Sequence, residues 1–237
     1  MYYIKDLYKL HTNSHYGLYK KGHAISTLDY NLACDYLQKI NYTLQDIRSE
    51  LVKPLNRSVL ICLLTYTTWI LEAVDELKKC YKQYVFQSVP FNMELLETNK
   101  KYIRALRSFA IAHPLTTNRH LDYQLDGNLR CIDIQVNSPN NRSMDFSRQE
   151  QKFYLDIDGL KAYNQQLVHY WLCVYNSKYQ ENKYFQYIGI NIGIICNIVN
   201  DYVDYIYMLD KHLSKLKIRK DQNKSTLLRQ KSRLETS

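Results

Sequence analysis

Apolar residues recur every three or four positions through long stretches of this 237-residue chain. That spacing gathers them on one face of an α-helix. The chain holds only 6 Gly and 4 Pro, so few residues interrupt these stretches. The predicted fold class is therefore mainly α, a bundle of about five long helices. We predict these helices over about 27–50, 54–84, 92–113, 158–175 and 183–216.

The third of these helices has the clearest ends. Asn92 can cap its first turn, and acidic Glu94 follows where the helix dipole favours negative charge. Basic residues, ending with Arg107, lie near the other end. Pro114 disfavours a helical conformation for the residue before it, so His113 is expected at or just past the helix end.

Residues 114–156 break the helical pattern. DGN at 126–128 is typical of a tight turn, and LRCIDIQV at 129–136 has the β-branched content of a strand. We interpret this stretch as an insertion with a small β-hairpin, packed against the helical body. Residues 1–216 are then one domain, and 217–237 form a flexible tail.

The net charge of +9 is uneven along the chain. Residues 211–237 hold nine basic and two acidic residues, so +7 of the charge lies at this end. Such an end can contact nucleic acid or anionic lipid, or it can be only a solvated tail.

The six cysteines form no C-x-x-C pair and lie mostly in apolar helical surroundings. We predict buried free thiols of a cytoplasmic protein. MYYIKDLYKL has no apolar core typical of a secretory signal. The apolar runs at 59–71 and 187–199 fall short of ~20 clean apolar residues, so no membrane contact is expected.

Metal chemistry has little support. His11 and His15 have the spacing of two ligands on one helical turn, but TNS between them and Gly17 after them disfavour a helix. A third ligand is not apparent. We expect no metal and no cofactor.

The stretch RSFAIAHP, residues 107–114, carries the strongest candidate chemistry. Arg107 and His113 would lie ~120° apart on an ideal helix, but Pro114 releases the histidine to swing back. The negative end of the helix dipole would raise the pKa of the imidazole above ~6.5, towards proton transfer at neutral pH. A guanidinium can bind a phosphate and stabilise its developing charge. Alternatively, the two residues are ordinary surface polars of a helix end.

Arg107 followed by five residues and His113-Pro114 at the end of a bundle helix resembles the motif of the HEPN superfamily. The resemblance implies a helical bundle that dimerises, so that two motifs line one cleft. Many members are metal-independent ribonucleases of toxin–antitoxin, abortive-infection or other defence systems. This chain departs from the commoner motif at Ser108, where Asn is frequent. It also lacks a tyrosine two residues after His113, which puts regulation by tyrosine modification in doubt.

The resemblance also implies roles for single residues. His113 would take the proton of an RNA 2′-hydroxyl, and Arg107 would stabilise the charged intermediate. A polar or acidic residue on a preceding helix often supports such a pair. In this chain the acidic candidates for that supporting role are Glu72, Asp75 and Glu76. Arg104, one turn before Arg107, is a further supporting candidate. Substrate-binding candidates beyond the motif are Asn118, Arg119 and His120, which can equally be plain loop polars.

The function predicted from these features is a metal-independent endoribonuclease that forms a homodimer and cleaves RNA. A toxin or antiphage role would add an antitoxin or regulatory protein as a partner. The alternative is a non-catalytic helical module that dimerises or binds a partner or ligand. A third hypothesis is RNA binding through residues 217–237 alone.

Overall fold

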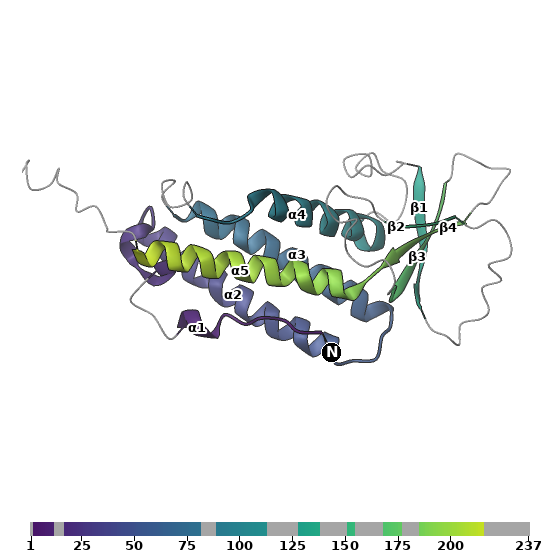
Figure 1. The fold of residues 1–237 in the computed structure, drawn as a ribbon, viewed down its shortest axis with the longest axis horizontal. Helices are drawn as coiled ribbons and strands as arrows, with labels where there is room; N and C mark the ends of the chain where they lie inside the picture. The colour runs from purple at the N-terminus through teal and green to yellow at the C-terminus, as the bar shows by residue number, and fades with distance from the viewer. Residues whose placement is uncertain are drawn as a thin grey trace, which may run out of the picture.

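The computed structural model describes residues 2–11, 17–81, 89–112, 128–137, 151–154, 168–176 and 185–215. Within these residues, four long helices form an elongated bundle and a small sheet lies at one end of it (Figure 1). The long helices are α2 (Thr27–Leu51), α3 (Arg57–Lys79), α4 (Met93–Arg107) and α5 (Ile192–Lys215). Short elements precede them: α1 (Tyr8–His11) and the 3₁₀ turns η1 (Gly17–Tyr19) and η2 (Lys21–His23). The mainly α class with a small β part is therefore confirmed.

Side chains placed before the first turn start three of the long helices. Ser26, Asn56 and Asn92 each accept a hydrogen bond at 3.1 Å from the backbone N–H three residues later. Each cap satisfies a donor that the helix itself leaves free. Asn92 is thus confirmed as the cap of α4. The second helix begins at Arg57 rather than at Pro54, because Asn56 is its cap.

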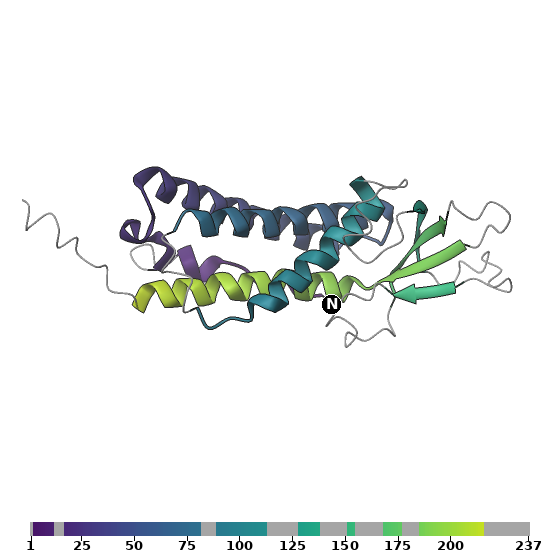
Figure 2. The ribbon, with the colours of Figure 1, turned by 90° about the horizontal axis from the view of Figure 1, so that it is seen from above.

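The central position of α3 follows from its apolar content. Its leucines lie at the middle of the core, and Leu60, Leu63 and Leu64 are fully buried. Helices α2, α4 and α5 all contact α3, and α4 crosses the bundle at an angle (Figure 2). Among the described helices, α3 alone is long and apolar enough to cross a membrane, and just over half of its most apolar window is buried. Such burial is typical of a core helix in a soluble protein.

The sheet has the strand order β1-β3-β4-β2. β1 pairs antiparallel with β3, β3 pairs antiparallel with β4, and β2 lies parallel to β4. A β-bulge interrupts the register between Cys131 and Asp133. The strands are β1 (Leu129–Val136), β2 (Gln151–Tyr154), β3 (Tyr170–Asn176) and β4 (Phe185–Ile190).

Two helix predictions are wrong where this sheet forms. Residues 170–176 and 185–190 are strands, although helices were predicted over 158–175 and 183–216. Their aromatic and β-branched residues suit a pleated surface, and an apolar run of this length does not distinguish a buried strand from a buried helix. The strand at 129–136 is confirmed, but its partner β3 is distant in sequence. The sheet is therefore larger than the predicted hairpin.

The N-terminal segment packs on the bundle through buried apolar side chains. Ile4, Leu7 and Leu10 are each no more than 3% exposed, so they belong to the core. Residues 2–7 are extended, and α1 then adds one helical turn. This segment lies along the bundle beside α2 and α5 (Figure 1).

Tyrosine side chains donate hydrogen bonds to backbone carbonyls at several places in the fold. In the described part of the chain, five hydroxyls donate to such carbonyls. The pairs are Tyr207 to Asp6, Tyr81 to Leu18, Tyr30 to Tyr19, Tyr202 to Leu96 and Tyr170 to Asn56. A phenol reaches far while burying its ring, so one side chain both fills the core and supplies a donor. This double use accounts for part of the 23 tyrosines in the chain.

All six cysteines are free, as predicted. Cys80, Cys131, Cys173 and Cys196 are buried, whereas Cys34 and Cys62 are half-buried. Burial raises the pKa of the Cys196 thiol to about 12 and that of Cys131 to about 11. These two thiols are therefore protonated and inert at neutral pH.

Candidate functional site

The candidate site lies at the C-terminal end of α4. Arg104 and Arg107 are exposed and one turn apart, while Leu106 and Phe109 are fully buried. The apolar residues hold the last turns of the helix on the bundle, and the two guanidinium groups consequently face solvent. Two neighbouring arginines at an exposed helix end can bind a phosphate group.

A single π-helical turn, η4 (Ser108–Ala112), continues α4 towards His113. Such turns are rare and frequently lie at functional sites. A π turn is wider than an α turn, so the ~120° offset of an ideal helix does not apply between residues 107 and 113. Phe109 anchors η4 in the core, and strand β1 packs against it. The turn that follows α4 therefore lies where the bundle meets the sheet.

His113 lies outside the described residues, as do Asn118, Arg119 and His120. The pairing of His113 with Arg107 and the substrate contacts of the three loop residues stay predictions. Residues 216–237 also lie outside the described part, so the contact of this tail with RNA is untested.

The acidic candidates on α3 have different environments. Asp75 forms an ion pair with Lys100 of α4, with Oδ2 and Nζ 2.5 Å apart, and its Oδ1 lies 3.8 Å from Lys78 Nζ. Glu76 pairs with Lys79 at 2.5 Å on the outer face of α3. The structure therefore brings Asp75 and Glu76 to lysines, and no ion pair within the described residues joins them to the α4 arginines.

Glu72 is the acidic candidate that stays exposed. Helices α3 and α4 run in opposite directions, and Asp75 of α3 lies opposite Lys100 of α4. One turn back along α3 and one turn forward along α4, Glu72 and Arg104 lie at about the same level of the bundle. Its role as a carboxylate that supports the arginines stays a prediction.

Polar contacts fix α4 against α5 behind this site. Asn99, which is fully buried, donates through Nδ2 to Asp201 Oδ2 at 2.8 Å. The Tyr202 hydroxyl donates to the Leu96 carbonyl at 3.1 Å. Burial raises the pKa of the Asp201 carboxyl above its usual value, and the bond from Asn99 offsets part of that rise. Buried polar pairs of this kind specify one register between two helices.

His169 is a residue that the sequence did not single out. Its Nδ1 accepts the Ile192 N–H at the start of α5 at 3.3 Å, and its Nε2 is hydrogen-bonded to the Tyr2 hydroxyl. Burial lowers the pKa of the ring below 6.5, so the ring is neutral at pH 7. Since Nδ1 accepts, the proton of the neutral ring lies on Nε2. His169 thus joins the sheet, the N-terminal segment and α5, a role that no local sequence motif indicates.

No group of three or more His, Cys, Asp or Glu residues in the described ranges is arranged to hold a metal ion. His15 lies outside those ranges, so the pair His11 and His15 is not tested. Comparison with protein-family models, with curated proteins and with solved structures finds no match for this chain.

Proposed function

We propose that this protein is a metal-independent endoribonuclease of the HEPN type, with Arg107 and His113 as its catalytic residues. His113 takes the proton of an RNA 2′-hydroxyl, whose oxygen then attacks the adjacent phosphorus. Arg107 stabilises the charge that develops on the phosphoryl oxygens. A second protomer's His113 protonates the leaving 5′-oxygen, so one product ends in a 2′,3′-cyclic phosphate.

The exposed pair Arg104 and Arg107 at the end of α4 is the observation that carries this proposal. Both side chains are exposed, and within the described residues neither guanidinium forms an ion pair with a carboxylate. The π-helical turn that follows leads the chain directly to His113. A requirement for the 2′-hydroxyl makes the substrate RNA rather than DNA.

The same proposal places the enzyme in the cytoplasm as a homodimer. Its six free thiols suit a reducing compartment. A growth-arresting or antiphage ribonuclease also needs restraint, so an antitoxin or regulatory protein belongs to the proposal as a partner. We include Asn118, Arg119 and His120 as substrate contacts, and Glu72 as the supporting carboxylate.

The deciding experiment is RNA cleavage by the purified protein in EDTA, followed by analysis of the product ends. The wild type and Lys101→Ala should cleave and leave cyclic phosphates, whereas His113→Ala should not. Lys101 is a suitable control because it is an exposed cation on the same helix. Cleavage that persists in pure His113→Ala, or that EDTA abolishes, contradicts the proposed mechanism.

A non-catalytic helical module is the second candidate function. Large apolar side chains lie exposed on α2 and α3, among them Leu28 (67%), Tyr42 (55%) and Trp69 (39%). Exposed apolar residues favour contact with another protein surface. In this case Leu28→Asp and Tyr42→Asp would abolish self-association or partner binding without altering any RNA cleavage. Sedimentation of both variants beside the wild type tests this surface, and the RNA cleavage assay on the same proteins separates the two functions.

A further inference from the structure

The N-terminal strap, residues 2–11, is bonded to both α2 and α5 in a way that resembles a bound peptide. Its backbone is held by side chains of the helices rather than by a β-ladder. Asn200 accepts the Lys5 N–H at 2.8 Å and donates to the Tyr3 carbonyl at 2.9 Å. One amide side chain thus bonds the strap as a neighbouring strand would.

Two further side chains complete the contacts with the strap backbone. Arg48 of α2 donates through Nη2 and Nε to the Ile4 carbonyl at 3.0 and 3.2 Å. Tyr207 of α5 donates to the Asp6 carbonyl at 2.7 Å. These bonds reach main-chain atoms, so they fix an extended segment without depending on its side chains.

Selectivity comes from the side chains that point into the bundle. Ile4, Leu7 and Leu10 are buried at every third position, while Tyr8 between them is 70% exposed. Main-chain bonds for affinity combined with spaced apolar pockets for selectivity are the pattern of peptide-recognition grooves.

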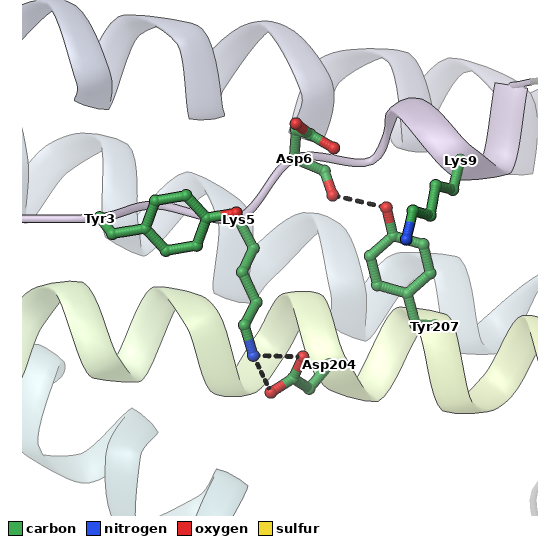
Figure 3. A pocket seen from close by; sticks show the side chains of 6 residues that line it. All are labelled: Tyr3, Lys5, Asp6, Lys9, Asp204 and Tyr207. Atoms are coloured by element: carbon green, nitrogen blue, oxygen red, sulfur yellow. Dashed lines mark hydrogen bonds and ion pairs between the residues drawn. The ribbon is translucent and has the colours of Figure 1, made fainter.

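A polar seam borders the groove on the α5 side (Figure 3). Lys5 reaches from the strap to Asp204, with Nζ 2.5 Å from Oδ2. A cavity of about 300 Å³ opens here, lined by Tyr3, Lys5, Asp6, Lys9, Asp204 and Tyr207. Both partners of the ion pair are about two-fifths exposed, so this contact is weak and can open.

We propose that the strap lies in a peptide-binding groove between α2 and α5 and fills it in cis as a displaceable occupant. The bound form is extended at first and ends in one helical turn. The peptide that fits carries apolar residues at three positions spaced by three, and a lysine directly after the first. A partner protein that presents such a segment would replace the strap. It would also release the bond between Tyr2 and His169 and loosen the joint between sheet and bundle.

The test uses the whole chain with a protease recognition sequence inserted between residues 11 and 17. After cleavage, the strap is held only by its non-covalent contacts. Fluorescently labelled synthetic peptide 1–11 is then added, and its anisotropy is measured. We expect saturable binding as labelled peptide exchanges with the bound strap, and competition by unlabelled peptide.

Matched peptides and one protein variant test the contacts. Tyr8→Ala peptide should compete like the natural one, whereas Leu7→Asp peptide should compete at least tenfold more weakly. Asn200→Ala in the protein should weaken binding of both labelled and unlabelled peptide. A cleaved protein that unfolds, or that stays folded and never takes up labelled peptide, overturns the proposal and makes the strap a fixed part of the core. RNA cleavage is not used as a readout, so this result is independent of the proposed catalytic function.

Discussion

Asp75 of α3 and Lys100 of α4 form an ion pair, with Oδ2 and Nζ 2.5 Å apart, and their side chains are only 27% and 15% exposed. The pair joins the helix that carries the acidic candidates to the helix that carries the arginines. It gives Asp75 a bracing role between α3 and α4.

Asp75→Ala should lower the free energy of unfolding by about 1–2 kcal/mol, because it leaves Lys100 largely buried without its partner. This loss of stability lies between the losses expected for breaking an exposed ion pair and a fully buried one. Glu76→Ala is the control, since its bond to Lys79 is mostly solvent-exposed and should cost less than about 0.5 kcal/mol. Urea unfolding of both variants measures the difference. Equal losses would show that the Asp75 pair braces nothing.

Arg107→Ala should reduce RNA cleavage by about 100-fold or more, the usual cost of removing a group that stabilises transition-state charge. Its side chain is exposed, so unfolding should change by less than about 0.5 kcal/mol. Single-turnover rates and urea unfolding are measured on the same preparation. A large loss of stability together with lost cleavage would assign Arg107 a structural role instead.

Leu7→Ala should destabilise the protein by about 2–3 kcal/mol, because the leucine is 1% exposed and its removal leaves a cavity. Tyr8→Ala, one residue further and 70% exposed, should stay within about 0.5 kcal/mol of the wild type. Thermal unfolding compares the two. If both variants match the wild type, the N-terminal strap does not contribute to the core.

Gly17→Ala should cost about 2 kcal/mol or more. The backbone there has φ of +64°, and an added Cβ would lie 2.1 Å from Asp210 Oδ1. The same carboxylate oxygen accepts the Leu18 N–H at 2.8 Å, so it cannot move away without losing that bond. Backbone strain and the loss of this hydrogen bond therefore both lower the stability of the variant. Gly22→Ala in the neighbouring turn is the comparison, and calorimetry should show the smaller effect there.

His169 should make stability fall as the pH drops below about 6.5. Burial lowers the pKa of its ring, so below this pH the unfolded chain binds more protons than the folded chain. The loss continues until the pH reaches the lowered pKa and then levels off. His169→Gln should flatten this part of the curve. Urea unfolding from about pH 7.5 to about pH 5.5 measures this change in stability. The raised pKa of Asp201 makes stability rise as the pH falls, but it does so equally in the wild type and the variant. An unchanged slope in the variant would mean that other groups cause it.

The long helices could be predicted because their signals are local. Apolar residues at helical spacing identify α2, α3 and α4, and Asn92 marks the start of α4 through a single side chain. The same periodicity predicted most of α5. The exposed position of Arg107 also follows from its place opposite the apolar face of α4.

Whether the residues of β3 and β4 form strands or helices was decided by tertiary structure. Their runs of apolar and aromatic residues suit a buried strand as well as a buried helix, and pairing with the distant β1 decided between the two. The different environments of the acidic candidates also depended on tertiary structure. Only the packing of α3 on α4 brings Lys100 to Asp75.

The sequence by itself determined the mainly α class, the caps and the amphipathic faces, since these depend on residues within a few turns of one another. Tertiary structure alone decided the place of the N-terminal strap and the role of His169. Residues 2–11 are bonded by side chains that lie 195 to 201 positions later, such as Asn200 and Tyr207. No local pattern encodes a contact between segments so far apart, because it forms only when the helices that supply those side chains have packed.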